Sequence, residues 1–252
     1  MPHLTHRQEA LIRSLQTRHG RRGSPFCCCD GLRSTREIAA LAPHLIESVL
    51  LREGIELPFA VPCEPVVLPE REFAKLAGPV NSQGILIVAR RPDPIPADAP
   101  IPDPFAFVLD RIGDPGNFGT ILRTARAIGL HEVWIVKGTV DPFSDKTLRS
   151  ASGAQFAIGL RWFDDLPALA ESLRRHGIRR IYRTVPSGGA NLFKEEDAFR
   201  SSAILMGCEA TGVAELDGSA TLSIPMPGDA ESLNVAQAAT VVLFEYARRM
   251  QI

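Results

Sequence analysis

Features that define several common protein classes are missing from this chain of 252 residues. No apolar run approaches the roughly 20 residues that a helix needs to span a bilayer, and the N-terminal stretch lacks the charged-then-apolar order of a signal peptide. No two of the five cysteines are spaced CxxC, so a zinc ribbon or thioredoxin-like site has no support, and we expect no metal. The adjacent cysteines at 27–29 are more typical of a buried strand, and this cysteine usage fits the reducing cytoplasm.

Lysine is also scarce, because only four of the 28 basic residues are lysines. The planar guanidinium of arginine suits phosphate better than an ammonium does, although a biased genomic base composition would give the same excess. The net charge of −1 argues against a uniformly basic nucleic-acid binder. Residues 1–36 differ, since seven arginines there outnumber Glu9 and Asp30. This excess indicates a solvated helix surface or, as we favour, an arm that contacts phosphates. Its candidate RNA contacts are Arg7, Arg13, Arg18, Arg21 and Arg22.

A proline-rich segment divides the chain. Residues 92–104 hold six prolines, so they can join neither a helix nor a central strand and are typical of an extended linker. We therefore predict a first domain over residues 1–91 and a second over residues 105–252.

Both domains are predicted to be α/β. In the first, apolar spacing indicates helices over 5–17 and 35–41 and strands over 26–30, 48–52 and 85–89. The second alternates more regularly, with strands over 105–110, 132–137, 178–185, 203–207 and 221–226 and helices over 118–128, 166–176 and 233–249. Strands that alternate with helices predict a parallel sheet covered on both faces.

The first segment that could carry chemistry is the glycine-rich loop at 113–119, between a strand and a helix. Its glycines are spaced three and three, which departs from the GxGxxG of nicotinamide- and flavin-binding folds, and no GxxxxGK[ST] loop occurs. Arg123 lies on the following helix, away from its buried face. The helix dipole does not favour an arginine near this end, yet an ordinary surface arginine remains an equal alternative.

Two further segments follow the later strands. An apolar strand at 203–207 leads directly to Glu209, and ligands bind at the carboxyl ends of parallel strands. The segment 222–235 brings Ser232 and Asn234 to the start of the last helix. Simpler roles stay open for each, because Glu209 can cap a backbone N–H and Ser232 can be a helix N-cap.

In this order and at these separations, the three segments resemble the motifs of the SpoU/TrmH family of SPOUT methyltransferases. NFGTILRTA at 117–125 is similar to the first motif, LMGCE at 205–209 to the second, and IPM at 224–226 with ESLNV at 231–235 to the third. The first domain more loosely resembles a substrate-binding module often fused to this family, through GRRG at 20–23, DG at 30–31 and QGILIV at 83–88.

The resemblance implies a parallel sheet with a deep trefoil knot, S-adenosylmethionine as the cofactor, and a homodimer formed through the knot domain. The implied reaction methylates the 2′-hydroxyl of a ribose in structured RNA. By position, the cofactor would contact Leu205, Gly207, Ile224, Met226, Ser232, Leu233 and Asn234.

The catalytic positions of the family match Asn117, Arg123, Glu209, Ser232 and Asn234. Arg123 matches the essential arginine, and because arginine stays protonated we interpret it as stabilising the oxyanion and the adjacent phosphate. We expect the other four to orient Arg123, the hydroxyl and the cofactor. Two positions depart from the family, since Ala210 stands where glycine is usual and Cys208 replaces a commoner small or polar residue.

The fused first domain favours ribosomal RNA over transfer RNA as the substrate. The alternatives are a tRNA 2′-O-methyltransferase and a non-catalytic knotted RNA-binding protein. The retained Asn117, Arg123, Glu209 and Asn234 argue against the second alternative. A dinucleotide-dependent oxidoreductase is disfavoured by the glycine spacing of the first segment.

Overall fold

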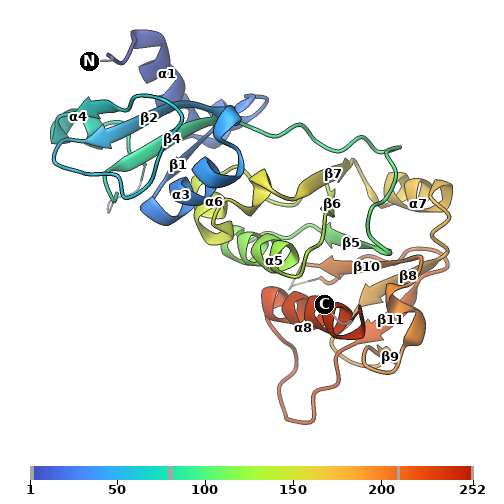
Figure 1. The fold of residues 1–252 in the computed structure, drawn as a ribbon. Coiled ribbons are helices and arrows are strands. Elements are labelled where there is room, and N and C mark those ends of the chain that lie inside the picture. The colour runs from blue at the N-terminus through green and yellow to red at the C-terminus, as the bar shows by residue number, and fades with distance from the viewer. Residues whose placement is uncertain (1–2, 79–81, 209–210, 251–252) are drawn as a thin grey trace. The chain divides into compact units, whose positions relative to one another are not determined.

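The computed structural model describes residues 3–78, 82–208 and 211–250. The chain forms two compact units, which are drawn in Figure 1. Unit 1 comprises Met1–Asp93 and Asp141–Ala157, and unit 2 comprises Pro94–Val140 and Ile158–Ile252. Residues 141–157, which the sequence analysis assigns to the second domain, therefore pack with unit 1. No helix in the described ranges is long and apolar enough to cross a membrane.

Unit 1 is built on a four-stranded sheet in the order β1-β4-β2-β3. The strands β1 and β2 run antiparallel to β4, whereas the unpredicted β3 runs parallel to β2. The strands are β1 (Phe26–Asp30), β2 (Ile46–Arg52), β3 (Val66–Leu68) and β4 (Ile85–Arg90). The helices and 3₁₀ turns are α1 (His6–Leu15), α2 (Arg18–Arg21), α3 (Leu32–Leu41), η1 (Pro43–Leu45), α4 (Glu70–Ala74), α6 (Asp145–Ala151) and η2 (Ala154–Phe156).

The three adjacent cysteines lie in β1 and are buried free thiols, as expected. Burial raises the pKa of the Cys27 thiol to about 12, so this thiol stays protonated at neutral pH. Cys28 packs in one cluster with Ile12 and Leu15 from the apolar face of α1. These cysteines therefore act as small apolar core residues.

Unit 2 is a seven-stranded sheet in the order β7-β6-β5-β10-β8-β11-β9, and all its strand pairings are parallel. The predicted parallel α/β sheet is confirmed. Its strands are β5 (Phe105–Asp110), β6 (Glu132–Val136), β7 (Gly159–Phe163), β8 (Arg180–Thr184), β9 (Ala190–Asn191), β10 (Ser202–Gly207) and β11 (Ala220–Ser223). Its helices and 3₁₀ turn are α5 (Pro115–Ala127), α7 (Leu166–Arg175), η3 (Glu196–Phe199) and α8 (Val235–Met250).

Alternate residues of β5 face opposite sides of the unit 2 sheet, because successive side chains of a strand point to opposite faces. Ala106 and Val108 pack in one core cluster with Leu169 of α7. Phe105 faces the other side, where its ring centroid lies 4.9 Å from that of Tyr246 on α8. Helices therefore cover both faces of β5, which explains its continuous apolar sequence.

The proline-rich segment is bound to unit 2 from Pro94 onward and does not form a free spacer. Its partner is Arg161 of β7, whose side chain is completely buried. Nη1 of Arg161 donates to the carbonyl oxygens of Pro96 at 2.9 Å, Ala97 at 3.2 Å and Ala99 at 2.8 Å, and Nη2 to that of Pro100 at 3.3 Å. A proline residue has a carbonyl acceptor but no N–H donor. A proline-rich segment therefore offers mainly acceptors, which suits a guanidinium because that group has only donors.

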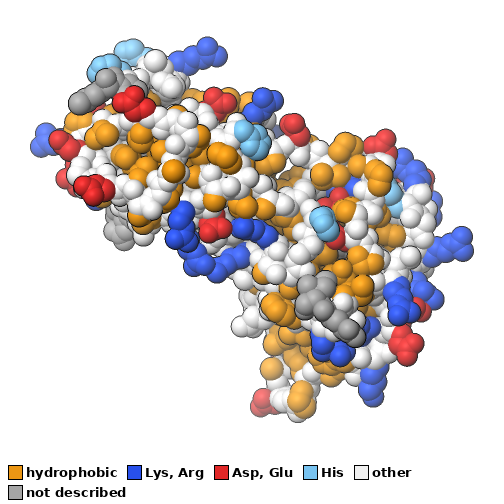
Figure 2. Space-filling model, in the orientation of Figure 1, with side chains coloured by type: hydrophobic (Ala, Val, Ile, Leu, Met, Phe, Trp, Pro, Cys, Tyr) orange, Lys and Arg blue, Asp and Glu red, His pale blue; other side chains and the backbone are white. Residues whose placement is uncertain are grey.

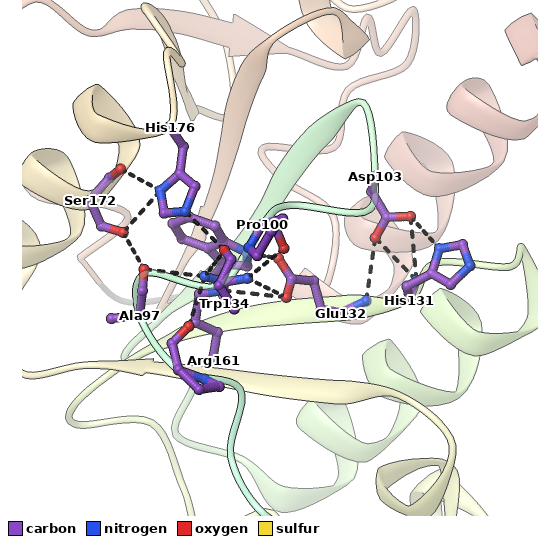
Figure 3. A network of polar contacts seen from close by, with 11 residues as sticks. Ala97, Pro100, Asp103, His131, Glu132, Trp134, Arg161, Ser172 and His176 are labelled. Carbon is purple, nitrogen blue, oxygen red and sulfur yellow. Dashed lines mark hydrogen bonds and ion pairs between the residues drawn. The ribbon is translucent and has the colours of Figure 1, made fainter.

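Figure 3 shows the rest of this network. Glu132 of β6 accepts from Arg161 Nη2 at 2.8 Å and from Trp134 Nε1 at 2.7 Å. The Arg161 guanidinium also lies 4.8 Å from the centroid of the Trp134 ring, in a cation–π contact. From α7, Ser172 Oγ donates to the Ala97 carbonyl at 3.1 Å. The buried charge of Arg161 is thus compensated by a carboxylate, an indole and several carbonyl groups.

Arginines also cover part of the unit 2 surface. Figure 2 shows Lys and Arg side chains along the side of this unit where α7 and β8 lie. The exposed arginines there are Arg174, Arg175, Arg179 and Arg180. Two of them are paired, Arg174 with Glu171 and Arg180 with Asp197 at 2.9 Å.

Candidate functional site

The first and second motifs meet at the carboxyl edge of the unit 2 sheet. The strands β5 and β10 are parallel neighbours, with Asp110 opposite Gly207 in the register. The glycine-rich loop leaves the end of β5 at this edge, and the chain after Gly207 leaves the end of β10 beside it. The carboxyl ends of parallel strands are where open α/β sheets bind ligands.

Asn117 lies in the first turn of α5. This helix begins at Pro115, earlier than predicted, because Asp114 is its N-cap and Pro115 occupies the first helical position. The Oδ1 atom of Asp114 accepts from the Asn117 backbone N–H at 2.8 Å.

The third motif is joined to the first by a pair of asparagines. Asn234 Nδ2 donates to Asn117 Oδ1 at 3.1 Å, across 117 positions of sequence. Asn234 Oδ1 accepts from the backbone N–H of Ala236 at 2.9 Å and thereby caps α8. The starts of α5 and α8 are therefore held together by side chains of two predicted site residues.

Arg123 is exposed on α5, as predicted, whereas Ile121, Leu122 and Ala125 of the same helix are buried. Arg123 forms no ion pair with any residue in the described part of the chain. Its guanidinium is therefore available to an anionic group outside the protein.

The backbone leaves no room for a side chain at Gly207. A Cβ there would lie 2.4 Å from the carbonyl carbon of Gly212 and from the backbone N of Val213, because the chain turns back over the end of β10. The Gly212 backbone N–H donates to the Cys208 carbonyl at 2.8 Å and closes this turn. The predicted site residue Glu209 and the departing Ala210 lie outside the described residues.

The segment between β11 and α8 has free backbone groups. The predicted strand over 221–226 ends at Ser223, before Pro225 and Pro227, which have no N–H for a sheet. Residues 224–233 make no hydrogen bond with any residue that the structure describes. Free donors and acceptors next to partly buried apolar side chains fit the heterocycle and methionine chain of S-adenosylmethionine. The predicted cofactor residues Ile224, Met226 and Leu233 are half-buried and Ser232 is exposed.

Leu205 differs from the other predicted cofactor residues. Its side chain is completely buried in the core cluster of unit 2. Its carbonyl oxygen accepts from Thr184 Oγ1 at 3.0 Å. The Leu205 side chain supports the sheet and is not open to a ligand.

The predicted RNA-contacting arginines of unit 1 divide into two groups. Arg21 has a structural role within unit 1, because its Nε lies 3.0 Å from Asp141 Oδ2 and its Nη1 donates to the Leu15 carbonyl at 3.1 Å. Arg13 is exposed but pairs with Glu9 on the same helix. The remaining three are exposed: Arg7, Arg18 and Arg22.

Sequence reasoning missed Arg111, which follows β5 directly. Its backbone φ is 53°, in the left-handed region, and its guanidinium pairs with the buried Asp110 at 2.9 Å. The signal that could have found it is a charged Asp-Arg pair where a buried strand ends.

The sequence profile described as the SpoU rRNA Methylase family matches residues 104–244. The chain is also 33% identical to the 23S rRNA (guanosine(2553)-2′-O)-methyltransferase RlmP of Bacillus subtilis, over 82% of this chain and 83% of that protein. The chain belongs to the SpoU rRNA methylase family. An uncharacterized tRNA/rRNA methyltransferase of Synechocystis is 38% identical over 71% of this chain, and the match spans 65% of that protein.

Two solved structures have the same fold over nearly the whole chain. The AdoMet-bound rRNA methyltransferase from Sinorhizobium meliloti superposes with a TM-score of 0.79 at 27% identity, covering 100% of this chain and 98% of that one. A protein of the TrmH family from Porphyromonas gingivalis gives the same TM-score at 25% identity, covering 98% of this chain and 100% of that one. The SpoU/TrmH resemblance and the α/β fold class are confirmed.

Proposed function

We propose that this SpoU-family protein transfers a methyl group from S-adenosylmethionine to the 2′-hydroxyl of a ribose in structured RNA. The observation that carries the proposal is the Asn117–Asn234 hydrogen bond of 3.1 Å, which joins the first and third motifs at the edge where β10 ends. Family membership and the AdoMet-bound relative support it. S-adenosylmethionine supplies a methyl group made electrophilic by its positively charged sulfur.

Within this proposal the residues take separate roles. Arg123 binds the phosphate beside the reacting ribose and stabilises the negative charge that develops on the 2′-oxygen as its proton passes to water, while the cofactor would leave as S-adenosylhomocysteine. The asparagine pair holds the starts of α5 and α8 in place, so that Arg123 and the cofactor segment keep a fixed geometry. Gly207 presents backbone alone, and Ile224 and Leu233 provide apolar surface. Ser232 and Glu209 are assigned to orienting the hydroxyl and the cofactor.

Ribosomal RNA is the substrate that we propose. The Bacillus subtilis relative named for 23S rRNA aligns with 82% of this chain. An alignment of that length must extend into the residues before 104, where the match to the family profile begins. A tRNA (guanosine(18)-2′-O)-methyltransferase of Thermus thermophilus is 34% identical but aligns with only 56%. Unit 1 therefore favours rRNA over the alternative of tRNA.

Deleting the gene and mapping 2′-O-methylated nucleotides in both RNA classes tests this choice. We expect one rRNA site to lose its methyl group and every tRNA site to keep it. Complementation with the Arg123→Ala gene should fail to restore the site, whereas the wild-type gene restores it. Loss confined to tRNA would contradict the rRNA assignment, and unchanged maps in both classes would contradict the activity.

We further propose that the start of unit 1 binds RNA phosphates through Arg7, Arg18 and Arg22. Replacing all three with glutamine should weaken RNA binding and make the slope of log K against log salt shallower by about 2, since each lost phosphate contact removes about 0.7–0.9. Binding titrations at several salt concentrations measure this slope.

A matched control removes the same charge from unit 2, through glutamine at Arg174, Arg175 and Arg179. This control should change the slope less than the unit 1 triple variant does. An equal change in both proteins would mean that net charge alone governs binding and would contradict the assignment to unit 1.

The proposed assembly is a homodimer formed through unit 2. On α8, the large apolar side chains of Phe244 and Met250 are 54% and 50% exposed, and we propose that the interface covers them. We also propose that unit 2 contains the trefoil knot implied by the family. The close crossing of residues 212–213 over Gly207 supports the knot. We place the protein in the cytoplasm, in keeping with its five free cysteines.

A further inference from the structure

Arg111 adopts a backbone conformation that is rare for a residue with a side chain. Its φ of 53° lies in the left-handed region, directly after the last residue of β5. Such a conformation persists only where the surrounding structure determines it, and residues of this kind gather at functional sites. The contacts of Arg111 show what determines it here.

The Arg111 guanidinium binds the ends of two segments at once. Its Nε lies 3.2 and 3.1 Å from the two carboxylate oxygens of Asp110, and its Nη2 lies 2.9 Å from Oδ2. Asp110 is 1% exposed, so this ion pair is anchored on the end of β5. The same Nη2 donates to the Gly212 carbonyl oxygen at 3.3 Å. The side chain passes so close to Gly138 that a Cβ there would lie 2.9 Å from Arg111 Cγ.

A second arginine holds the next carbonyl group. Arg183 of β8 donates from Nη1 to the Val213 carbonyl oxygen at 3.4 Å and from Nε to Ser219 Oγ at 2.8 Å. Gly212 and Val213 are the residues that cross over Gly207. Since β5 and β8 are the two neighbours of β10 in the sheet, the crossing segment is held from both sides of the strand that it covers.

We propose that Arg111 is a positioning residue for the cofactor site, acting together with Arg183 to hold Gly212 and Val213 against Gly207. The inference rests on the proposed function, because it takes the backbone at the end of β10 as part of the S-adenosylmethionine site. Arg111 acts through this backbone and not on the reacting atoms. Its loss therefore weakens cofactor binding more than it slows the chemical step.

An Arg111→Gly variant removes the guanidinium and relieves the backbone strain, because glycine accepts a φ of 53°. Calorimetric titration with S-adenosylmethionine should give a Kd about tenfold above that of the wild type, which is within the range usual for energetic coupling between two sites. With saturating cofactor, kcat should stay within about threefold. The Kd of Arg111→Lys should lie between those of the wild type and Arg111→Gly. An ammonium can pair with Asp110, but it is a point charge and cannot form the two parallel hydrogen bonds of a guanidinium.

Arg180→Ala is the matched control, because Arg180 lies at the opposite end of β8 from the site and its one ion pair with a described residue is to Asp197. It should bind S-adenosylmethionine as the wild type does. A Kd within about twofold of wild type for Arg111→Gly with an unchanged unfolding midpoint, or a fall in kcat alone, would overturn the inference. If Arg111→Gly does not fold, the Kd, unfolding midpoint and kcat of Arg111→Lys are compared with those of the wild type in the same way. A wild-type protein that binds no S-adenosylmethionine would contradict the proposed function itself.

Discussion

An Arg123→Ala protein is expected to lose methyl transfer by about 10³-fold, the upper range for removing one group that stabilises an oxyanion. The reason is that Arg123 is exposed on α5 and forms no ion pair in the described part of the chain, so its charge is free for the reacting RNA. Arginine stays protonated, and its loss therefore removes a stabilising charge. Single-turnover assays with RNA and labelled S-adenosylmethionine measure the effect.

Cofactor binding separates this role from a structural one. Because Arg123 does not pack in the core, the variant should bind S-adenosylmethionine with a Kd within about twofold of wild type. Arg123→Lys should recover only part of the rate, since lysine cannot bind a phosphate through two parallel N–H groups. Arg126→Ala, on the same helix, is the matched control and should keep most of the activity. Turnover of Arg123→Ala at the wild-type rate would contradict the catalytic assignment.

Arg161→Met is expected to reduce the free energy of unfolding of unit 2 by about 3–5 kcal/mol, the usual effect of removing one partner of a buried ion pair. The variant leaves Glu132 buried without its cation and frees the carbonyls of Pro96, Ala97 and Ala99. These groups lose hydrogen bonds in a place that water does not readily reach.

The chain offers a selective probe for this measurement. Its two tryptophans are Trp134 and Trp162, both in unit 2, so the urea transition in tryptophan fluorescence reports on this unit. Arg248→Met is the control, because Arg248 is 67% exposed in its pair with Glu245 and should change stability by less than about 1 kcal/mol. Equal transitions for Arg161→Met and the wild type would show that the buried network contributes no net stability.

The central strands of unit 2 could be predicted because both their faces are buried. The continuous apolar runs that become β5 and β10 are typical of strands in the middle of a parallel sheet covered on both faces. Strand β7 was missed because Arg161 interrupts its apolar sequence, and an isolated arginine within a short apolar run does not read as a buried strand. The carbonyl groups that accept from its guanidinium lie more than 60 positions away, and its carboxylate partner Glu132 lies 29 positions away.

Contacts between residues far apart in sequence also could not be predicted for the proline-rich segment and for the basic start of the chain. Proline content predicted an extended backbone, yet only the fold shows that its carbonyls meet Arg161. Local charge predicted a basic arm, but it could not show that Arg21 is bound to Asp141, 120 positions away. In the site, the resemblance to the SpoU/TrmH motifs identified Asn117 and Asn234. Their contact and the role of Arg111 depend on strand order, which local pattern does not determine.

The most direct test of the proposed reaction is to locate the transferred methyl group. Purified protein would be incubated with labelled S-adenosylmethionine and unmodified 23S or 16S rRNA, and the RNA would then be digested to nucleosides. We predict that the label is found in one 2′-O-methylated nucleoside, that the phosphodiester bond on its 3′ side resists alkaline hydrolysis in the undigested RNA, and that Arg123→Ala gives about 10³-fold less label. Label on a base, or rRNA that stays unlabelled while the protein binds both substrates, would contradict the assignment.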